Sequence, residues 1–157
     1  MSTALPAIGA KAPDFTLPRD GGGEVTLSAL EGAPVVVFFY PKASTPGCTM
    51  EARDFTAALP DFVAAGAQVV GISKDSVKRQ ENFAARQELA MPLLSDADSD
   101  TCERWGVWGE KKMYGKTFEG IVRTTVLIGA DGQVVRVWSP VKVKGHVEEV
   151  LAAVRAL

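Results

Sequence analysis

The chain has 157 residues, the length of one ordinary globular domain, so we expect a single domain over residues 1–157. Hydrophobic residues make up 46% and charged residues 23%, which excludes an intrinsically disordered chain. Seventeen basic and nineteen acidic residues leave a net charge of −2, so nothing favours a nucleic-acid partner or an anionic membrane. Because no apolar run approaches about 18 residues and no secretory signal is recognisable, we expect a cytoplasmic protein.

The N-terminal part of the chain predicts a small hairpin followed by a buried strand. Short strands at 14–17 and 24–26 flank a glycine-rich turn. Residues 35–40, VVVFFY, are continuously β-branched or aromatic, which is typical of a strand that is buried on both faces.

A helix is predicted directly after this strand. Thr45 is a good N-cap residue, and Pro46 suits the first helical position. The apolar stripe of an amphipathic helix follows, formed by Cys48, Ala52, Phe55, Leu59 and Phe62. Pro60 is expected to end or kink this helix.

Further along, the chain continues to alternate strands and helices. We expect extended segments at 69–73, 91–95, 124–128 and 133–138 and helices at 76–89, 99–105 and 145–157. The polar stretch 109–120 predicts a long loop, and 130–132 predicts a hairpin turn. This pattern indicates an α/β fold with a mixed central sheet flanked by helices.

Cys48 is the first candidate functional residue, because sites in α/β proteins commonly lie where a strand ends and a helix begins. The unpaired N–H groups and partial positive charge of a helix N-terminus favour a thiolate, but only by ~0.3–1 kcal/mol. A reactive thiolate therefore needs further donors. The candidates are the hydroxyl of Thr45, three residues earlier, and the guanidinium of Arg123, which opens the strand at 124–128.

An inert core cysteine is the alternative interpretation of Cys48, since an isolated cysteine on an apolar helical stripe is commonly a small core residue. The polar, turn-forming flank 41–47 favours a reactive cysteine at a loop-to-helix edge. Cys48 and Cys102 are too few for a disulfide scaffold, and with one histidine they cannot supply the four ligands of a structural zinc site.

The segment 41–48, PKASTPGC, resembles the Pro-x-x-x-Thr-x-x-Cys signature of peroxiredoxins. The segments 38–40 (FFY), 106–116 (GVWGEKKMYGK) and 120–125 (GIVRTT) are similar to the subgroup called bacterioferritin comigratory protein or peroxiredoxin Q. The resemblance extends from about residue 12 into the last helix, which is nearly the whole chain.

This resemblance implies a thioredoxin fold with an N-terminal β-hairpin extension. It implies reduction of hydrogen peroxide and organic hydroperoxides by Cys48, the peroxidatic nucleophile, which passes through a sulfenic acid. Thr45 and Arg123 are then hydrogen-bond donors, and Pro41 shields the sulfur. No metal or organic cofactor is implied, and the expected protein is a monomer that thioredoxin, glutaredoxin or a small thiol recycles.

The chain departs from this subgroup in lacking the usual resolving cysteine, because the two positions where members often carry it hold Arg53 and Ala84. Cys102 lies three residues before Trp105, a spacing that favours a buried structural cysteine on a short helix. Resolution by Cys102 would need local unfolding, since the Cα atoms of a disulfide lie within ~7 Å. We therefore expect a one-cysteine cycle completed by an external thiol.

Other functions also fit the sequence. Thr45 stands where C-x-x-C enzymes carry their first cysteine, which argues against a dithiol exchange enzyme. A redox sensor or interaction module, in which oxidation of Cys48 changes a partner surface, stays open, as does a binding domain with an inert Cys48. Glu51, one turn after Cys48, either orients Arg123 or suits the helix N-terminus. His146 is expected on the surface.

Overall fold

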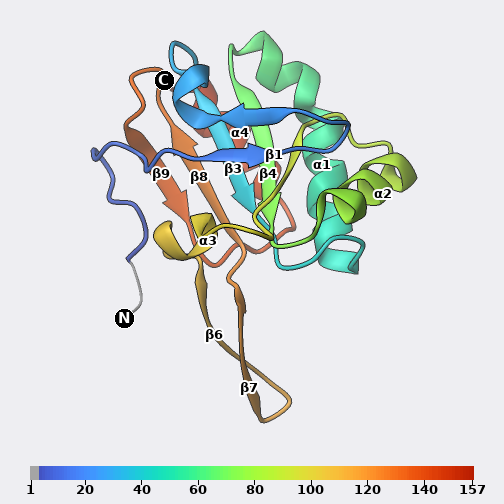
Figure 1. Cartoon of the computed structure of the whole chain (residues 1–157). Helices are drawn as coiled ribbons and strands as arrows, with labels where there is room; N and C mark the ends of the chain where they lie inside the picture. Colours follow the sequence, from blue (N-terminus) through green and yellow to red (C-terminus); the bar gives the residue numbers. More distant parts are fainter. Residues whose placement is uncertain (1–3) are drawn as a thin grey trace.

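The computed structural model describes residues 4–157, apart from the side chain of Met113. Its centre is a five-stranded sheet in the order β5-β4-β3-β8-β9 (Figure 1). In chain order these strands are β3 (Val35–Phe39), β4 (Gln68–Ser73), β5 (Leu93–Ser95), β8 (Thr124–Ile128) and β9 (Val134–Trp138). β3, β4 and β5 are parallel to one another, whereas β8 and β9 pair antiparallel. The predicted α/β class with a mixed central sheet is therefore confirmed.

Hairpins and helices surround this sheet in the described part of the chain. The N-terminal hairpin pairs β1 (Thr16–Pro18) with β2 (Glu24–Thr26), and a second hairpin pairs β6 (Trp108–Met113) with β7 (Lys116–Ile121). The helices are η1 (Leu27–Leu30), α1 (Pro46–Ala64), α2 (Val77–Gln87), α3 (Thr101–Arg104) and α4 (His146–Arg155). Most of these elements differ from the predicted ranges only by a few terminal residues.

The sheet has an apolar core on each face, because alternate residues of a strand point to opposite sides. Val36 and Phe38 of β3 face α1, α2 and α4, whereas Val35, Val37 and Phe39 face the N-terminal hairpin and α3. All five side chains are buried, which explains why the sequence of β3 is continuously apolar.

The stretch 109–120 forms most of the β6–β7 hairpin, so the predicted loop is wrong. The two strands pair from Trp108 opposite Ile121 outward, and the hairpin projects from the body of the protein (Figure 1). Tyr114 and Gly115 at its tip have φ of 53° and 76°, the left-handed conformation that the tightest hairpin turns require. Because most of β7 is exposed, the hairpin lacks the alternating apolar pattern by which strands are recognised.

Helix α1 continues through Pro60 to Ala64, so of the two predicted effects Pro60 does not end the helix, and a kink at Pro60 stays a prediction. Beyond the proline, Phe62 is fully buried, and its ring centroid lies 5.9 Å from that of Phe55. Packing of this last turn against the sheet outweighs the backbone hydrogen bond that the proline removes.

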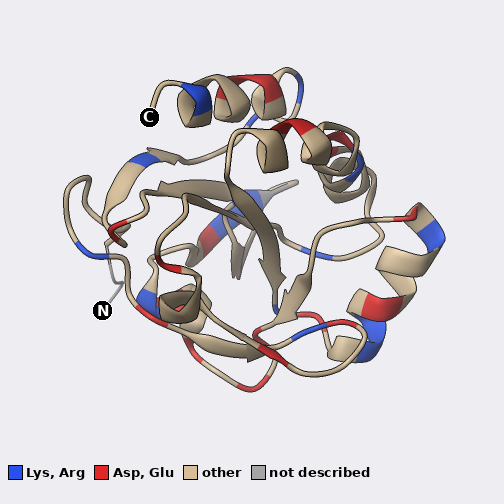
Figure 2. Ribbon diagram, turned by 90° about the horizontal axis from the view of Figure 1, so that it is seen from above, with Lys and Arg blue, Asp and Glu red and all other residues tan. Residues whose placement is uncertain are grey.

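Charged residues lie mainly on the outer helices and loops (Figure 2). The strands β3, β4, β5 and β8 carry none at all, whereas the buried carboxylates Asp75 and Asp96 lie just beyond the carboxyl ends of β4 and β5. Within residues 4–157, no helix combines the length and hydrophobicity needed to cross a bilayer.

Candidate active site

The pairing of β3 with β8 places Arg123 beside the loop that leads to Cys48. The two strands are antiparallel with Phe39 opposite Thr124, so the end of β3 lies next to the start of β8. Arg123 immediately precedes Thr124, and the chain that leaves Phe39 turns into α1. The register of the sheet therefore brings together two residues that are 75 positions apart in the sequence.

Cys48 lies in the first turn of α1, where Thr45 is the N-cap residue and Pro46 opens the helix. Cys48 is only 1% exposed, so its sulfur is almost completely shielded from solvent. The Thr45 hydroxyl donates to the carbonyl oxygen of Lys42 at 2.7 Å and therefore not to the sulfur in this conformation. The role of Thr45 as a donor to a reactant stays a prediction.

Arg123 holds the Cys48 sulfur and the Glu51 carboxylate at the same time. Its Nη2 donates to Cys48 Sγ at 3.3 Å, and its Nη1 donates to Glu51 Oε1 at 2.9 Å. Burial works against the charge on Arg123, but Cys48 and Glu51 raise its pKa above the ordinary value. The forked guanidinium makes the two contacts from two different nitrogen atoms that are held in a fixed plane. Of the two roles considered for Glu51, the structure favours orientation of Arg123.

Glu51 itself is a fully buried carboxyl group with one unused oxygen. Its Oε2 has no hydrogen-bond partner among the described residues. Burial raises the pKa of Glu51 from 4.5 to about 7, although Arg123 acts in the opposite direction. The charge balance around Arg123 is therefore expected to change near neutral pH.

Gly47 allows the guanidinium to approach the start of α1. A Cβ atom at this position would lie 3.1 Å from Arg123 Nη2, closer than ordinary van der Waals contact. A larger residue would push Nη2 away from the sulfur. This role was not predicted from the sequence, where its only signal is a glycine within the first turn of a helix.

Pro41 and Lys111 line a groove that adjoins this site. Pro41 is half-buried, and its role as a shield of the sulfur stays a prediction. The Nζ of Lys111 donates to the carbonyl oxygen of Ile121 at 2.9 Å. Burial and the nearby Arg123 lower the pKa of Lys111, whereas Cys48 acts to raise it, so its ammonium group lies within electrostatic reach of the site. Lys111 was not predicted as a site residue, because the hairpin that carries it was predicted as a loop.

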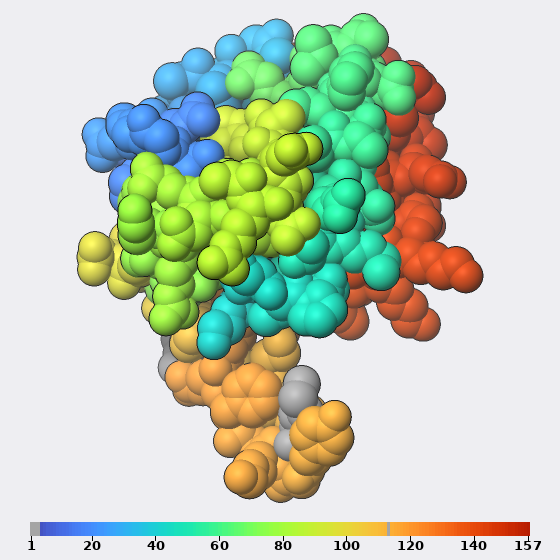
Figure 3. Space-filling model, turned by 90° about the vertical axis from the view of Figure 1, so that its right-hand side faces the viewer, coloured from blue at the N-terminus to red at the C-terminus, as the bar shows by residue number. Residues whose placement is uncertain are grey.

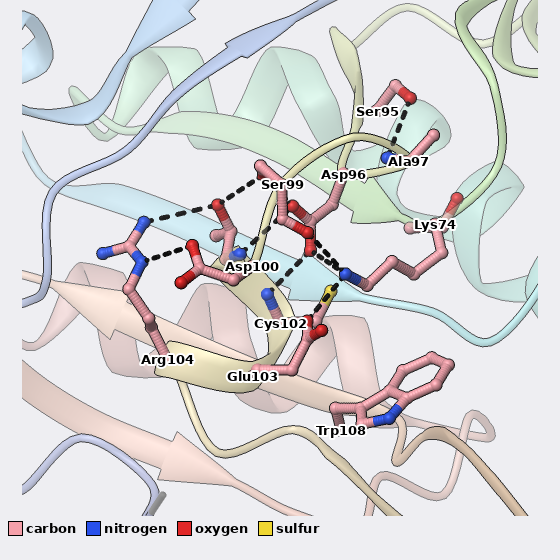
Figure 4. A network of polar contacts seen from close by, with 12 residues as sticks. Lys74, Ser95, Asp96, Ala97, Ser99, Asp100, Cys102, Glu103, Arg104 and Trp108 are labelled. Carbon is pink, nitrogen blue, oxygen red and sulfur yellow. Dashed lines mark hydrogen bonds and ion pairs between the residues drawn. The ribbon is translucent and has the colours of Figure 1, made fainter.

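Cys102 lies on the opposite face of the sheet from Cys48. The two cysteines belong to different apolar cores, and both are free thiols. Cys102 is fully buried, and burial raises its pKa far above the ordinary value. Its amide donates to Asp96 Oδ2 at 2.8 Å, within a network that includes Lys74, as Figure 4 shows. These contacts favour the structural role for Cys102.

His146, which was expected on the surface, is buried, so that prediction is wrong. It begins α4, is 3% exposed, and its Nε2 lies 2.8 Å from the Thr125 hydroxyl. The rings of Phe55 and Trp138 pack against it edge-on. Burial lowers the pKa of His146 from 6.5 to about 4, so the ring is neutral at physiological pH.

The arrangement suits redox chemistry at a single sulfur atom. The thiol lies at a helix N-terminus with a guanidinium aimed at it, which stabilises an attacking thiolate and the negative charge that develops on a leaving oxygen. Among residues 4–157, no group of three or more histidine, cysteine or acidic side chains is placed to hold a metal ion. The fold and the site together define a cysteine-based redox protein with an α/β core.

Comparison with known proteins identifies the family. The chain matches the AhpC/TSA family over residues 8–137. It is 49% identical over 156 residues to peroxiredoxin Bcp of Xanthomonas campestris pv. campestris, which covers 99% of this chain and 98% of the relative. It is 44% identical over 140 residues to peroxiredoxin Bcp of Escherichia coli K12, covering 89% and 90%. The chain therefore belongs to the AhpC/TSA family of peroxiredoxins, in the Bcp or peroxiredoxin Q subgroup.

Solved structures of relatives agree with this assignment. The bacterioferritin comigratory protein of X. campestris has a TM-score of 0.86 at 50% identity, with 90% of both chains covered. A mutant of Xylella fastidiosa PrxQ has a TM-score of 0.91 at 39% identity, with 96% of both chains covered. The expected thioredoxin fold is confirmed, and the protein is a thiol-dependent peroxidase.

Proposed function

We propose that this protein reduces hydrogen peroxide and organic hydroperoxides through a Cys48 sulfenic acid, which an external thiol then reduces. The contact between Arg123 Nη2 and Cys48 Sγ at 3.3 Å carries the proposal. The X. campestris relative is described as having alkyl peroxide reduction activity, which supports organic hydroperoxides as substrates.

The first half-reaction is an attack by sulfur on oxygen. The Cys48 thiolate attacks the terminal oxygen of the hydroperoxide, an S–O bond forms, and the O–O bond breaks. The leaving hydroxide or alkoxide takes up a proton and departs as water or alcohol. Arg123 stabilises the charge that moves from sulfur to the leaving oxygen, and Glu51 keeps the guanidinium in place. Rotation about χ1 would let Thr45 donate to the peroxide, while Pro41 would limit access of water.

The second half-reaction needs a thiol from outside the chain. Cys102 lies across the sheet, and its buried sulfur cannot reach the sulfenic acid without unfolding of α3. A first external thiolate forms a mixed disulfide with Cys48 and releases water, and a second restores the Cys48 thiolate. Thioredoxin, glutaredoxin or a small thiol could supply both, and we propose that the enzyme works as a cytoplasmic monomer.

The intact mass of the reduced protein after one equivalent of hydrogen peroxide tests this proposal. We expect a gain of about 16 Da that a sulfenic-acid reagent traps on Cys48. Cys48→Ser should abolish both the gain and peroxide turnover, whereas the control Cys102→Ser should keep both. Full turnover in Cys48→Ser would overturn the assignment of the nucleophile. A loss of about 2 Da in the wild type would reveal an internal disulfide and overturn the external-thiol cycle.

Turnover separates the enzyme from a redox sensor. With excess thiol, the enzyme consumes many equivalents of peroxide, whereas a sensor reacts once and is reduced slowly. A single turnover under these conditions would contradict the proposed function.

A further inference from the structure

A groove of about 540 Å³ opens beside the Cys48 site, between the β6–β7 hairpin and the loops that follow β3 and β4. Pro41 lines it from the β3 side, and Trp108, Phe118 and Ile121 line it from the hairpin. The hairpin stands away from the body below the start of α1, so the groove is bounded by a protruding wall (Figure 3). This volume is in the range of small-molecule sites, typically ~300–1,000 Å³.

The polar lining of the groove is mainly basic. Its charged residues are Lys42, Lys74, Arg79, Lys111, Asp75 and Glu119. Lys74 is neutralised from outside the groove, because its Nζ lies 3.0 Å from Asp96 Oδ2 and 2.6 Å from Glu103 Oε1. The carboxylate of Asp75 is buried and accepts hydrogen bonds from the Ala43 amide and the Ser73 hydroxyl.

A second hollow shares Arg79 with this groove and extends the basic surface. It is lined by Ala43, Ser44, Arg79, Asn82 and Arg86, with no acidic side chain among them. Four basic groups therefore remain along the two hollows, Lys42, Arg79, Arg86 and Lys111, against the exposed carboxylate of Glu119 and the buried one of Asp75. The Asp75 carboxylate makes one long contact with this set, from Oδ1 to Arg79 Nη1 at 3.9 Å, and the Arg79 side chain stays 65% exposed. This local excess of positive charge occurs on a chain whose net charge is −2.

Two of the residues that line the groove, Lys111 and Pro41, lie close to the Cys48 site. Lys111 lines the groove, and the charges of Arg123 and Cys48 both act on its pKa. Pro41 lines it as well, at the start of the loop that leads to Cys48. A molecule held in the groove therefore lies beside the loop that leads to Cys48.

We propose that this basic groove binds the external resolving thiol and that this thiol is a small molecule carrying carboxylate groups. The inference rests on the proposed function, because it names the class of thiol that acts on the Cys48 sulfenic acid. A sulfur that is 1% exposed beside a protruding hairpin is more accessible to a small thiol than to one on a folded protein surface. The basic groups hold the carboxylates and also favour the thiolate form of the bound thiol, which is the form that attacks.

The chemistry balances with two molecules of thiol for each peroxide. The first thiolate forms an S–S bond with Cys48, and the hydroxide that leaves takes up a proton to become water. The second thiolate attacks the sulfur of the bound thiol, which releases the small-molecule disulfide and the Cys48 thiolate. The two electrons that reduced the peroxide come from the two external thiols.

Rates of resolution with thiols of different charge test the proposal. Cys48 is first oxidised with one equivalent of hydrogen peroxide, and decay of the sulfenic acid is then followed with mercaptosuccinate, 2-mercaptoethanol or cysteamine. With rates expressed per thiolate, we expect mercaptosuccinate to react about tenfold faster than 2-mercaptoethanol, and cysteamine to react most slowly. Because ion pairing is screened, 0.5 M KCl should remove most of this difference.

Substitutions locate the effect in the groove. Arg79→Gln and Lys42→Gln should each slow mercaptosuccinate about threefold, in line with loss of one exposed ion pair. Lys78→Gln is the matched control, because Lys78 is an exposed neighbour of Arg79 on α2 that does not line either hollow. This control should leave the rates unchanged.

Three results would overturn the inference. The thiols could show equal rates per thiolate, Arg79→Gln could behave like Lys78→Gln, or a dithiol protein such as thioredoxin could resolve Cys48 faster than saturating mercaptosuccinate. Failure of Cys48 to gain an oxygen at all would instead overturn the proposed function, and this inference with it.

Discussion

Glu51→Gln should change how the stability of the protein depends on pH. Burial raises the pKa of Glu51 from 4.5 to about 7, so the folded protein binds this proton more tightly than the unfolded chain does. The resulting stabilisation is complete below about pH 4.5 and is lost as the pH rises to about 7. At 1.36 kcal/mol for each pKa unit, the loss amounts to ~3 kcal/mol. Glutamine keeps the shape of the side chain but cannot titrate.

His146→Gln should have the opposite effect. Burial lowers the pKa of His146 from 6.5 to about 4, so the folded protein resists protonation of the ring. Stability from this group is complete above about pH 6.5 and is lost as the pH falls toward 4, again by ~3 kcal/mol. Glutamine can keep a hydrogen bond to the Thr125 hydroxyl. In the wild type the two opposing slopes nearly cancel between about pH 4.5 and 6.5.

Urea denaturation followed by tryptophan fluorescence from pH 4.5 to 7.5 measures both effects. The free energy of unfolding of Glu51→Gln minus that of the wild type should rise with pH, and the same difference for His146→Gln should fall. Other titrating groups are shared by all three proteins, so these differences remove them. A flat difference for Glu51→Gln would show that Arg123 keeps the carboxyl ionised throughout, and the argument from burial would then be wrong.

Three further substitutions test the site and the core. Arg123→Lys should lower the rate of Cys48 oxidation by hydrogen peroxide about 100-fold in stopped-flow measurements, because lysine lacks the two separate nitrogen atoms that donate to Cys48 and Glu51. Cys102→Ala should change this rate less than about twofold, since Cys102 lies across the sheet; a large loss would give it a part in the reaction. Gly71→Ala should lower the free energy of unfolding by ~1–3 kcal/mol, because its Cβ would lie 2.7 Å from Phe38 Cζ. An unchanged urea midpoint would contradict that clash.

The parts of the fold that could be predicted from the sequence are those with a buried face. β3 is recognisable from its continuous apolar run, and α1 from the apolar stripe between Cys48 and Phe62. Burial requires apolar residues at these positions, so each element can be identified from its own segment of sequence. The candidate site followed from the same logic, since the end of a buried strand and the start of a helix meet at Cys48.

The parts that could not be predicted depend on contacts between distant residues. The β6–β7 hairpin has little buried surface, so its pairing leaves no apolar period in the sequence. His146 is buried because Thr125, Phe55 and Trp138 converge on it from three other elements. The sequence of α4, which carries His146, gives no sign of these three contacts. The same limit applies to Lys111, whose position near the site depends on the pairing of β6 with β7.

The two half-reactions depend on different parts of the structure. The distance between Cys48 and Arg123 is set by the pairing of Phe39 with Thr124 at the end of two buried strands, so the peroxide step uses a rigid arrangement. The proposed thiol step uses the hairpin wall and exposed side chains such as Arg79. Changes in β3 or β8 should therefore slow oxidation of Cys48, whereas changes at the exposed groove residues Arg79 and Lys42 should slow only its reduction. A peroxiredoxin built in this way can change its reductant by surface substitutions while its peroxide chemistry stays intact.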